Sequence, residues 1–242
     1  MSKTLTLPLL GSFWLWSLIG YAPPAEASVR TAEGSGFALN DNETWLETGT
    51  TKPDIASAAE QLINNVKETH YQHKTHVDPT QGVYDLDCSG LVDYLLKRVA
   101  PDRFAELPIE PGHARPRAAM YYEFISGLSQ QPATGWEVIQ KLSDAKRGDI
   151  IAWERTASTE GDTGHVVIIA RDPVLQSDEL YAVEVYDSSG IHHEQDTRPV
   201  GTSGVGRGTI FFRINRDGQP TAFQFNRHAN FHEEPIAIGR LN

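Results

Sequence analysis

YDLDCSGLVDYLLKR, residues 84–98, contains Cys88, the single cysteine of this 242-residue chain. Asp87 suits the N-cap of a helix that begins at the cysteine, and Lys97 and Arg98 suit its last turn. The apolar residues of the stretch have the spacing of one buried helical face: Leu91, Val92, Leu95, Leu96 and Val99. A thiol in a first helical turn experiences the positive end of the helix dipole, which favours the thiolate.

Two interpretations of Cys88 follow from this stretch alone. A free cysteine is most often a small buried hydrophobic residue. A thiolate at a helix start is instead a nucleophile. An unpaired cysteine in an exported protein is a candidate for a reactive thiol, so the compartment of the protein bears on the choice.

The first residues have the pattern of a secretory signal peptide. Lys3 supplies a positive start, residues 5–19 are largely apolar, and Ala25-Glu26-Ala27 offers a cleavage site with small residues. The alternative is an uncleaved anchor, but the apolar run is shorter than the roughly 20 residues of a spanning helix. We expect a signal peptide over 1–27, a polar linker over 28–51, no transmembrane segment after cleavage, and a periplasmic or secreted protein.

Composition limits the classes of partner. The net charge is −11, and the sequence shows no basic stripe that could bind phosphate groups, so we expect no nucleic acid partner. A hydrophobic content of 39% and a charged content of 22% are ordinary for a globular domain, so an ordinary core must stabilise it. A single cysteine excludes an internal disulfide bond.

Helical patterns come first in the mature chain and strand patterns later. Helices are expected from Pro53-Asp54, from Cys88, from Pro116 and over 136–142, with a loop over 70–83 and a proline-rich connection over 101–116. Strands are expected over 147–153, 164–170, 180–189 and 208–214, with 221–225 and 235–241 as two more. Short, turn-rich connections between these strands predict an antiparallel sheet.

This order predicts an α+β fold in one domain, 52–242, with helices packed on one face of an antiparallel sheet of about five or six strands. His70, His73 and His76 lie in the expected loop. We interpret them as solvated rather than as metal ligands, because no cysteine or carboxylate cluster accompanies them. We expect no metal and no cofactor.

A cysteine nucleophile needs a base and a third group that orients the base. His165 starts a predicted strand directly after Gly164, and Asp187 closes the apolar run of the next one. If these strands are antiparallel neighbours, the two side chains lie side by side, and the carboxylate can accept the imidazole N–H. Taken alone, His165 is better interpreted as a solvent-exposed strand end, and the competing interpretation of Asp187 is a residue that starts a turn.

Four motifs in this order resemble those of the NlpC-type cell-wall cysteine peptidases, which have a papain-like fold: DCSGLV with Cys88, RGDIIAW from Arg147, GHVVIIA with His165, and VYDSS with Asp187. The resemblance covers most of 71–214. It implies a papain-like domain with Cys88 as nucleophile, His165 as general base and Asp187 as the third group, where many members have a histidine.

The same resemblance implies substrate-binding roles for Tyr71, Asp87 and Ser89. It implies hydrolysis of amide bonds in the peptide stems of peptidoglycan, often between γ-D-glutamyl and diamino-acid residues, by a protein expected to be a monomer. Two alternatives stay open: an amidase or acyl transferase with another substrate, and a non-catalytic module that keeps the fold. The pairs His192 with His193 and His228 with His232 receive no role.

Overall fold

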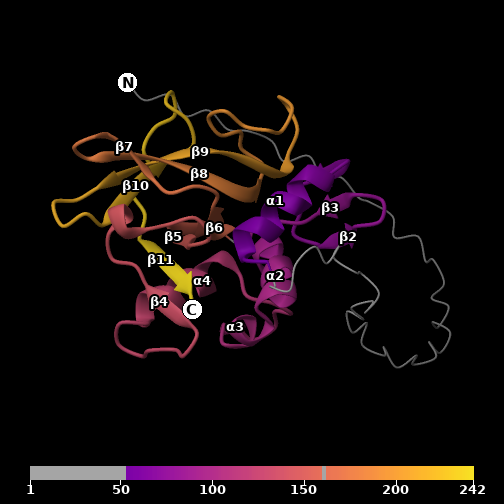
Figure 1. Ribbon diagram of the computed structural model, residues 1–242, viewed down its shortest axis with the longest axis horizontal. Helices are drawn as coiled ribbons and strands as arrows, with labels where there is room; N and C mark the ends of the chain where they lie inside the picture. The colour runs from indigo at the N-terminus through magenta and orange to yellow at the C-terminus, as the bar shows by residue number, and fades with distance from the viewer. Residues whose placement is uncertain (1–52, 160–161) are drawn as a thin grey trace, which may run out of the picture. The chain divides into compact units, whose positions relative to one another are not determined.

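The α-helices precede the strands of the large sheet, in the order that the sequence predicts (Figure 1). The computed structural model describes residues 53–159 and 162–242, which belong to one compact unit. The predicted signal peptide (1–27) and linker (28–51) lie outside these residues. Within them, no helix has the length and hydrophobicity needed to cross a membrane.

Each of the two long N-terminal helices begins after an aspartate. Asp54 accepts a hydrogen bond from the backbone N–H of Ser57, and Asp87 accepts one from Gly90, as N-cap residues do. In the described part of the chain the helices are α1 (Ile55–Asn65), α2 (Cys88–Val99), α3 (Pro101–Ala105), α4 (Ala118–Gly127) and the short 3-10 helix η1 (Leu142–Asp144).

The large sheet is antiparallel throughout and has eight strands in the described residues. Its order is β10-β9-β8-β6-β5-β11-β4, and β7 pairs with β8. The strands are β4 (Trp136–Val138), β5 (Ile150–Thr159), β6 (Asp162–Ile169), β7 (Val174–Ser177), β8 (Leu180–Ser189), β9 (Gly204–Ile214), β10 (Pro220–Gln224) and β11 (Ile236–Leu241).

Two details of the predicted sheet are wrong. The sheet has eight strands instead of five or six, because β4 and β7 join the six predicted strands. The helix predicted over 136–142 is absent: Trp136–Val138 forms β4, and its partner is the C-terminal strand β11. Pairing with so distant a segment overrides the local pattern, which carries no information about it.

The predicted loop over 70–83 is also wrong in part. A small sheet of order β1-β3-β2 occupies this region, with β1 and β3 parallel. Its strands are β1 (Glu68–His70), β2 (His76–Asp78) and β3 (Val83–Asp85). Strands of three residues are too short to show an alternating pattern in a sequence.

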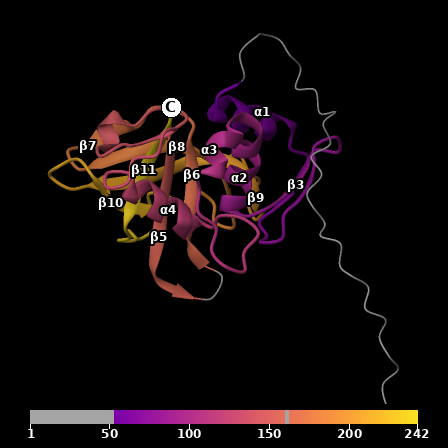
Figure 2. The same cartoon turned by 90° about the horizontal axis from the view of Figure 1, so that it is seen from below.

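The large sheet separates two hydrophobic cores. One core lies between the helices and one sheet face, and includes Leu91 and Leu95 of α2 with Val166 and Ile168 of β6. The other contains the opposite face, including Trp153 and Phe223, and β10 contacts β11 across it. In Figure 2, α1 and α2 gather on one side of the molecule and β7 and β10 on the other. The start of α2 therefore reaches the strands β6 and β8 that carry His165 and Asp187.

Candidate active site

Cys88 is the first residue of α2 and is 4% exposed. The carboxylate of Asp87 accepts the N–H of Gly90 at 2.7 Å, which fixes the helix start around the cysteine. Behind it, the apolar face of α2 packs in the core between helices and sheet. The sulfur is thus held at a rigid, capped helix terminus.

His165 lies near the start of β6, opposite Trp153 of β5. Gly164 has a φ of +133°, and a Cβ there would lie 1.9 Å from the carbonyl oxygen of Trp153. Only glycine fits this close approach of two backbones. The Trp153 ring lies 5.1 Å from the imidazole, centroid to centroid, and forms a wall of the site. Glycine at 164 is therefore required by the neighbouring strand.

The imidazole of His165 joins the cysteine to the aspartate. Its Nε2 donates to Oδ2 of Asp187 at 2.7 Å, and the ring also hydrogen-bonds with Cys88. Because Nε2 faces the carboxylate, Nδ1 is the nitrogen left to exchange a proton with the sulfur. Burial alone would lower the pKa of His165, but the charge of Cys88 and the hydrogen bonds with Asp187 and Cys88 raise it to about 10.

Asp187 is fully buried near the end of β8. β6 and β8 are antiparallel neighbours, with Ile168 opposite Tyr186, so the condition for placing His165 beside Asp187 is met. Burial alone would raise the pKa of Asp187, but the charge of His193, hydrogen bonds from His165 and His193, and the charge of Arg198 hold it well below its usual range. The carboxylate is therefore ionised at neutral pH.

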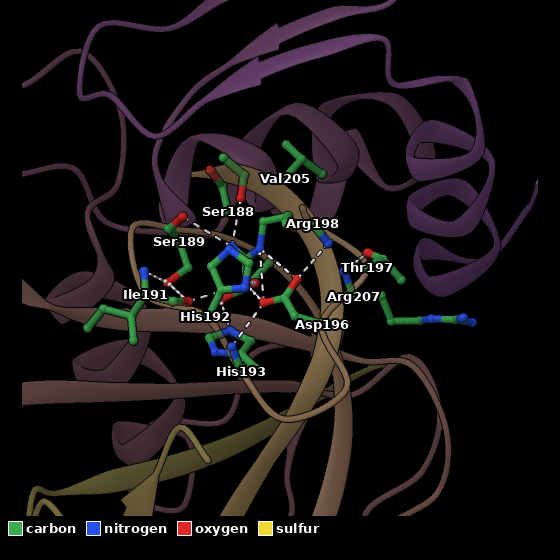
Figure 3. A network of polar contacts seen from close by, with 12 residues as sticks. Ser188, Ser189, Ile191, His192, His193, Asp196, Thr197, Arg198, Val205 and Arg207 are labelled. Carbon is green, nitrogen blue, oxygen red and sulfur yellow. Dashed lines mark hydrogen bonds and ion pairs between the residues drawn. The ribbon is translucent and has the colours of Figure 1, made fainter. Parts of the chain in front are cut away.

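Sequence reasoning assigned no role to His193, which donates from Nε2 to Oδ2 of Asp187 at 2.8 Å. The loop that carries it is fastened by Arg198, which donates to the carbonyl oxygens of Ser189 and Gly204 and pairs with Asp196. Figure 3 shows Asp196 between Arg198 and His193. The loop has no periodic pattern, so only its folding back beside β8 reveals these contacts.

Tyr71, predicted to bind substrate, is partly buried and hydrogen-bonds with Cys88. Burial, the charges of Cys88 and Asp87 and that hydrogen bond raise the pKa of Tyr71. Its ring meets the His73 ring edge-on at 5.9 Å. The phenol is thus a neutral hydrogen-bonding group next to the sulfur, and its substrate-binding role stays a prediction.

Asp87 and Ser89, also predicted to bind substrate, are engaged by Arg115. One Nη of Arg115 lies 2.7 and 2.8 Å from the two carboxylate oxygens of Asp87, and the other donates to Oγ of Ser89 at 2.6 Å. Both side chains are nearly buried and bonded within the protein. They hold the start of α2 in place; contact with a substrate stays a prediction.

Arg115 also reaches Asp93, one turn further along α2, at 3.3 Å. The hydroxyl of Tyr121 donates to the same carboxylate at 2.7 Å. Burial raises the pKa of Asp93 to about 7, although the hydrogen bond from Tyr121 and the charge of Arg115 act in the opposite direction. Arg115 was missed because it lies in the connection predicted over 101–116, far from α2 in sequence.

The histidines of the region 70–76 bond with aspartates instead of with one another. His70 lies 2.9 Å and His76 3.7 Å from Asp85, and His73 lies 3.1 Å from Asp87. In the described ranges, no group of three or more His, Cys, Asp or Glu side chains is arranged to hold a metal ion.

No protein-family model matches the chain, and no curated protein matches it. One similar solved structure is the "Crystal structure of a wild type endolysin LysIME-EF1", at 15% identity and a TM-score of 0.35. The match covers 72% of this chain and 66% of that chain.

Proposed function

We propose that the protein is a cysteine hydrolase of amide bonds, in which Cys88 is the nucleophile, His165 the acid–base group and Asp187 the residue that orients His165. The observation that carries the proposal is the imidazole that bonds to the sulfur on one side and to a buried carboxylate, 2.7 Å away, on the other. This is the arrangement that activates a nucleophile through a base and fixes the tautomer of that base.

The first step is attack of the Cys88 thiolate on the substrate carbonyl. Asp87 already occupies the N–H of Gly90, and the N–H groups of Cys88 and Ser89 precede it in the same turn. They are the candidate donors to the oxyanion, since the first N–H groups of a helix have no partner within it. Such a donor contributes about 3–4 kcal/mol to the barrier reduction.

The second step is departure of the amine. The His165 imidazolium donates its Nδ1 proton to the leaving nitrogen, and the carbonyl carbon stays bound to sulfur as a thioester. The neutral ring then takes a proton from water, which attacks the thioester and releases the acid and the thiolate. Asp187 stays ionised throughout and stabilises the imidazolium in each cycle.

We propose peptide stems of peptidoglycan as the substrate, cleaved between γ-D-glutamyl and diamino-acid residues. This assignment rests on the resemblance of the four motifs to the NlpC-type peptidases, and the contacts of α2 with β6 and β8 support it. The predicted signal peptide would bring the protein to the compartment that contains this polymer. The proposal of amide hydrolysis, in contrast, rests on the geometry of the site and not on this resemblance.

Incubation of the purified mature protein with peptidoglycan and defined muropeptides tests both levels of the proposal. Mass analysis should detect fragments with a newly freed diamino-acid amine, and Cys88→Ala should release none. Release of product only from other amides, or acyl transfer to an added amine, would replace the substrate and keep the thiol chemistry. No turnover of any amide or ester would instead indicate a non-catalytic module.

The alkaline limb of the pH profile provides a further prediction. Because the pKa of His165 lies near 10, kcat/KM should fall about tenfold per pH unit above that value, as the acid for the leaving amine is lost. Alkylation of Cys88 by iodoacetamide needs only the thiolate and should not fall. A limb near pH 7 would contradict the raised pKa of His165.

Folding must be monitored in the same pH series. Since the pKa of His165 is raised from 6.5 to about 10, the stability from its interactions is complete below 6.5 and is lost as the pH rises through 10. Circular dichroism at each pH separates this loss from the loss of the general acid.

A further inference from the structure

We propose that His193 is a positioning residue that holds the Asp187 carboxylate in the orientation required by His165. The inference rests on the proposed function, because it assigns His193 to the same proton-transfer chain. Within the part of the chain that the structure describes, His193 contacts Asp187 and not Cys88, so its effect passes through Asp187.

Two imidazole rings bond to one oxygen of Asp187. Nε2 of His165 lies 2.7 Å and Nε2 of His193 2.8 Å from Oδ2. Within the described residues Oδ1 has no hydrogen-bond partner, and the nearest cation, Nη2 of Arg198, lies 3.6 Å away. Without His193, a single hydrogen bond would hold the carboxylate, and Oδ2 could rotate toward Arg198 and away from His165.

The His193 ring is itself held rigidly. It stacks on Phe225 with centroids 5.3 Å apart and an interplanar angle of 6°, and its side chain is fully buried. The backbone N–H of His193 donates to Asp196 at 2.9 Å. The Cβ of His193 also lies close against Gly208, where an added Cβ would be only 2.7 Å away from it. The ring therefore reaches Asp187 from a fixed place, which a positioning residue requires.

The other nitrogen of His193 distinguishes positioning from proton transfer. Nδ1 is buried and has no hydrogen-bond partner in the described part of the chain. A ring that relays a proton needs a partner on each nitrogen, whereas a ring that only orients a carboxylate needs one N–H. Among the described residues, the ring of His193 thus makes one hydrogen bond, the one to Asp187.

Two substitutions separate the hydrogen bond from the packing. His193→Phe keeps a planar ring against Phe225 and removes the donor, whereas His193→Gln keeps an N–H donor and removes the ring. The matched control is His192→Phe, because His192 is the neighbouring histidine and, among the described residues, its ring bonds to the Thr202 carbonyl oxygen, at 3.1 Å, and not to Asp187. Activity on the muropeptide and the NMR titration of the His165 ring are measured for each folded protein.

For His193→Phe we expect kcat to fall about tenfold with little change in KM, the effect of losing one hydrogen bond to a charged group. The pKa of His165 should rise, because the carboxylate no longer shares its charge with a second donor. His193→Gln should recover most of kcat, and His192→Phe should match the wild type.

The proposal is overturned if the His165 titration in His193→Phe is unchanged or moves down, or if kcat equals that of His192→Phe. If His193→Phe does not fold, the wild type supplies the measurement: the Nε2–H resonance of His193 should shift as His165 titrates, and a constant resonance overturns the proposal. Failure of the proposed function is a separate result: Cys88 would then be alkylated at the same rate in the wild type and in His165→Ala.

Discussion

Replacing His165 with alanine should lower kcat/KM for amide hydrolysis by about 10⁴-fold, the size of effect expected when the base of a nucleophilic triad is removed. In the wild type the ring interacts with Cys88 and is fixed by Asp187. Without it, the thiolate loses its counter-charge and the leaving amine loses its acid. Alkylation of Cys88 by iodoacetamide near neutral pH should slow markedly as well.

His113→Ala is the matched control for this experiment. His113 is exposed, and Glu110, 3.9 Å away, is its charged partner at that surface. Its removal should leave both turnover and alkylation at wild-type levels. Equal alkylation rates in His165→Ala and His113→Ala, or labelling of Cys88 only in denaturant, would make Cys88 a structural cysteine.

Replacing Arg115 with methionine should lower the free energy of unfolding by about 3–5 kcal/mol. Arg115 is the cation between two nearly buried carboxylates, Asp87 and Asp93, and bonds to Ser89 as well. Methionine fills a similar volume but removes the cation that bridges the two carboxylates. Denaturant unfolding, compared at constant m value, measures the loss.

The pH dependence of that loss has a definite sign. Burial raises the pKa of Asp93 from 3.8 to about 7, so its ionisation costs stability progressively as the pH rises through this interval. Without Arg115 the ionised form is still less favourable. The difference between Arg115→Met and the wild type should therefore be larger at pH 8 than at pH 5.

Arg147→Met provides the matched control for Arg115→Met. Arg147 pairs with Asp54 and Glu60, whose side chains are 60% and 49% exposed. An exposed pair is worth about 0–1 kcal/mol, so this substitution should have a small effect. Equal losses in the two variants would show that the cluster at the start of α2 is no stronger than a surface pair.

Local patterns were sufficient where a segment carries its own signal. The apolar spacing after Cys88 and the N-cap Asp87 predicted α2 with its observed start. The apolar runs around His165 and Asp187 predicted β6 and β8, and the short connections predicted their antiparallel sheet. Capping, helical spacing and strand alternation depend on neighbouring residues, so one sequence is enough to recognise them.

Only the tertiary structure decided the partners of these residues. Segments that share no local pattern are joined by the pairing of β4 with β11, by the bond from His193 to Asp187 and by the hydrogen bonds from Arg115 to Asp87. The sequence by itself determined which thiol, imidazole and carboxylate could form a site and on which elements they lie. Their distances, the second histidine and the shared arginine depend on how sheet and helices pack, because burial and contact between distant segments arise only when the core closes.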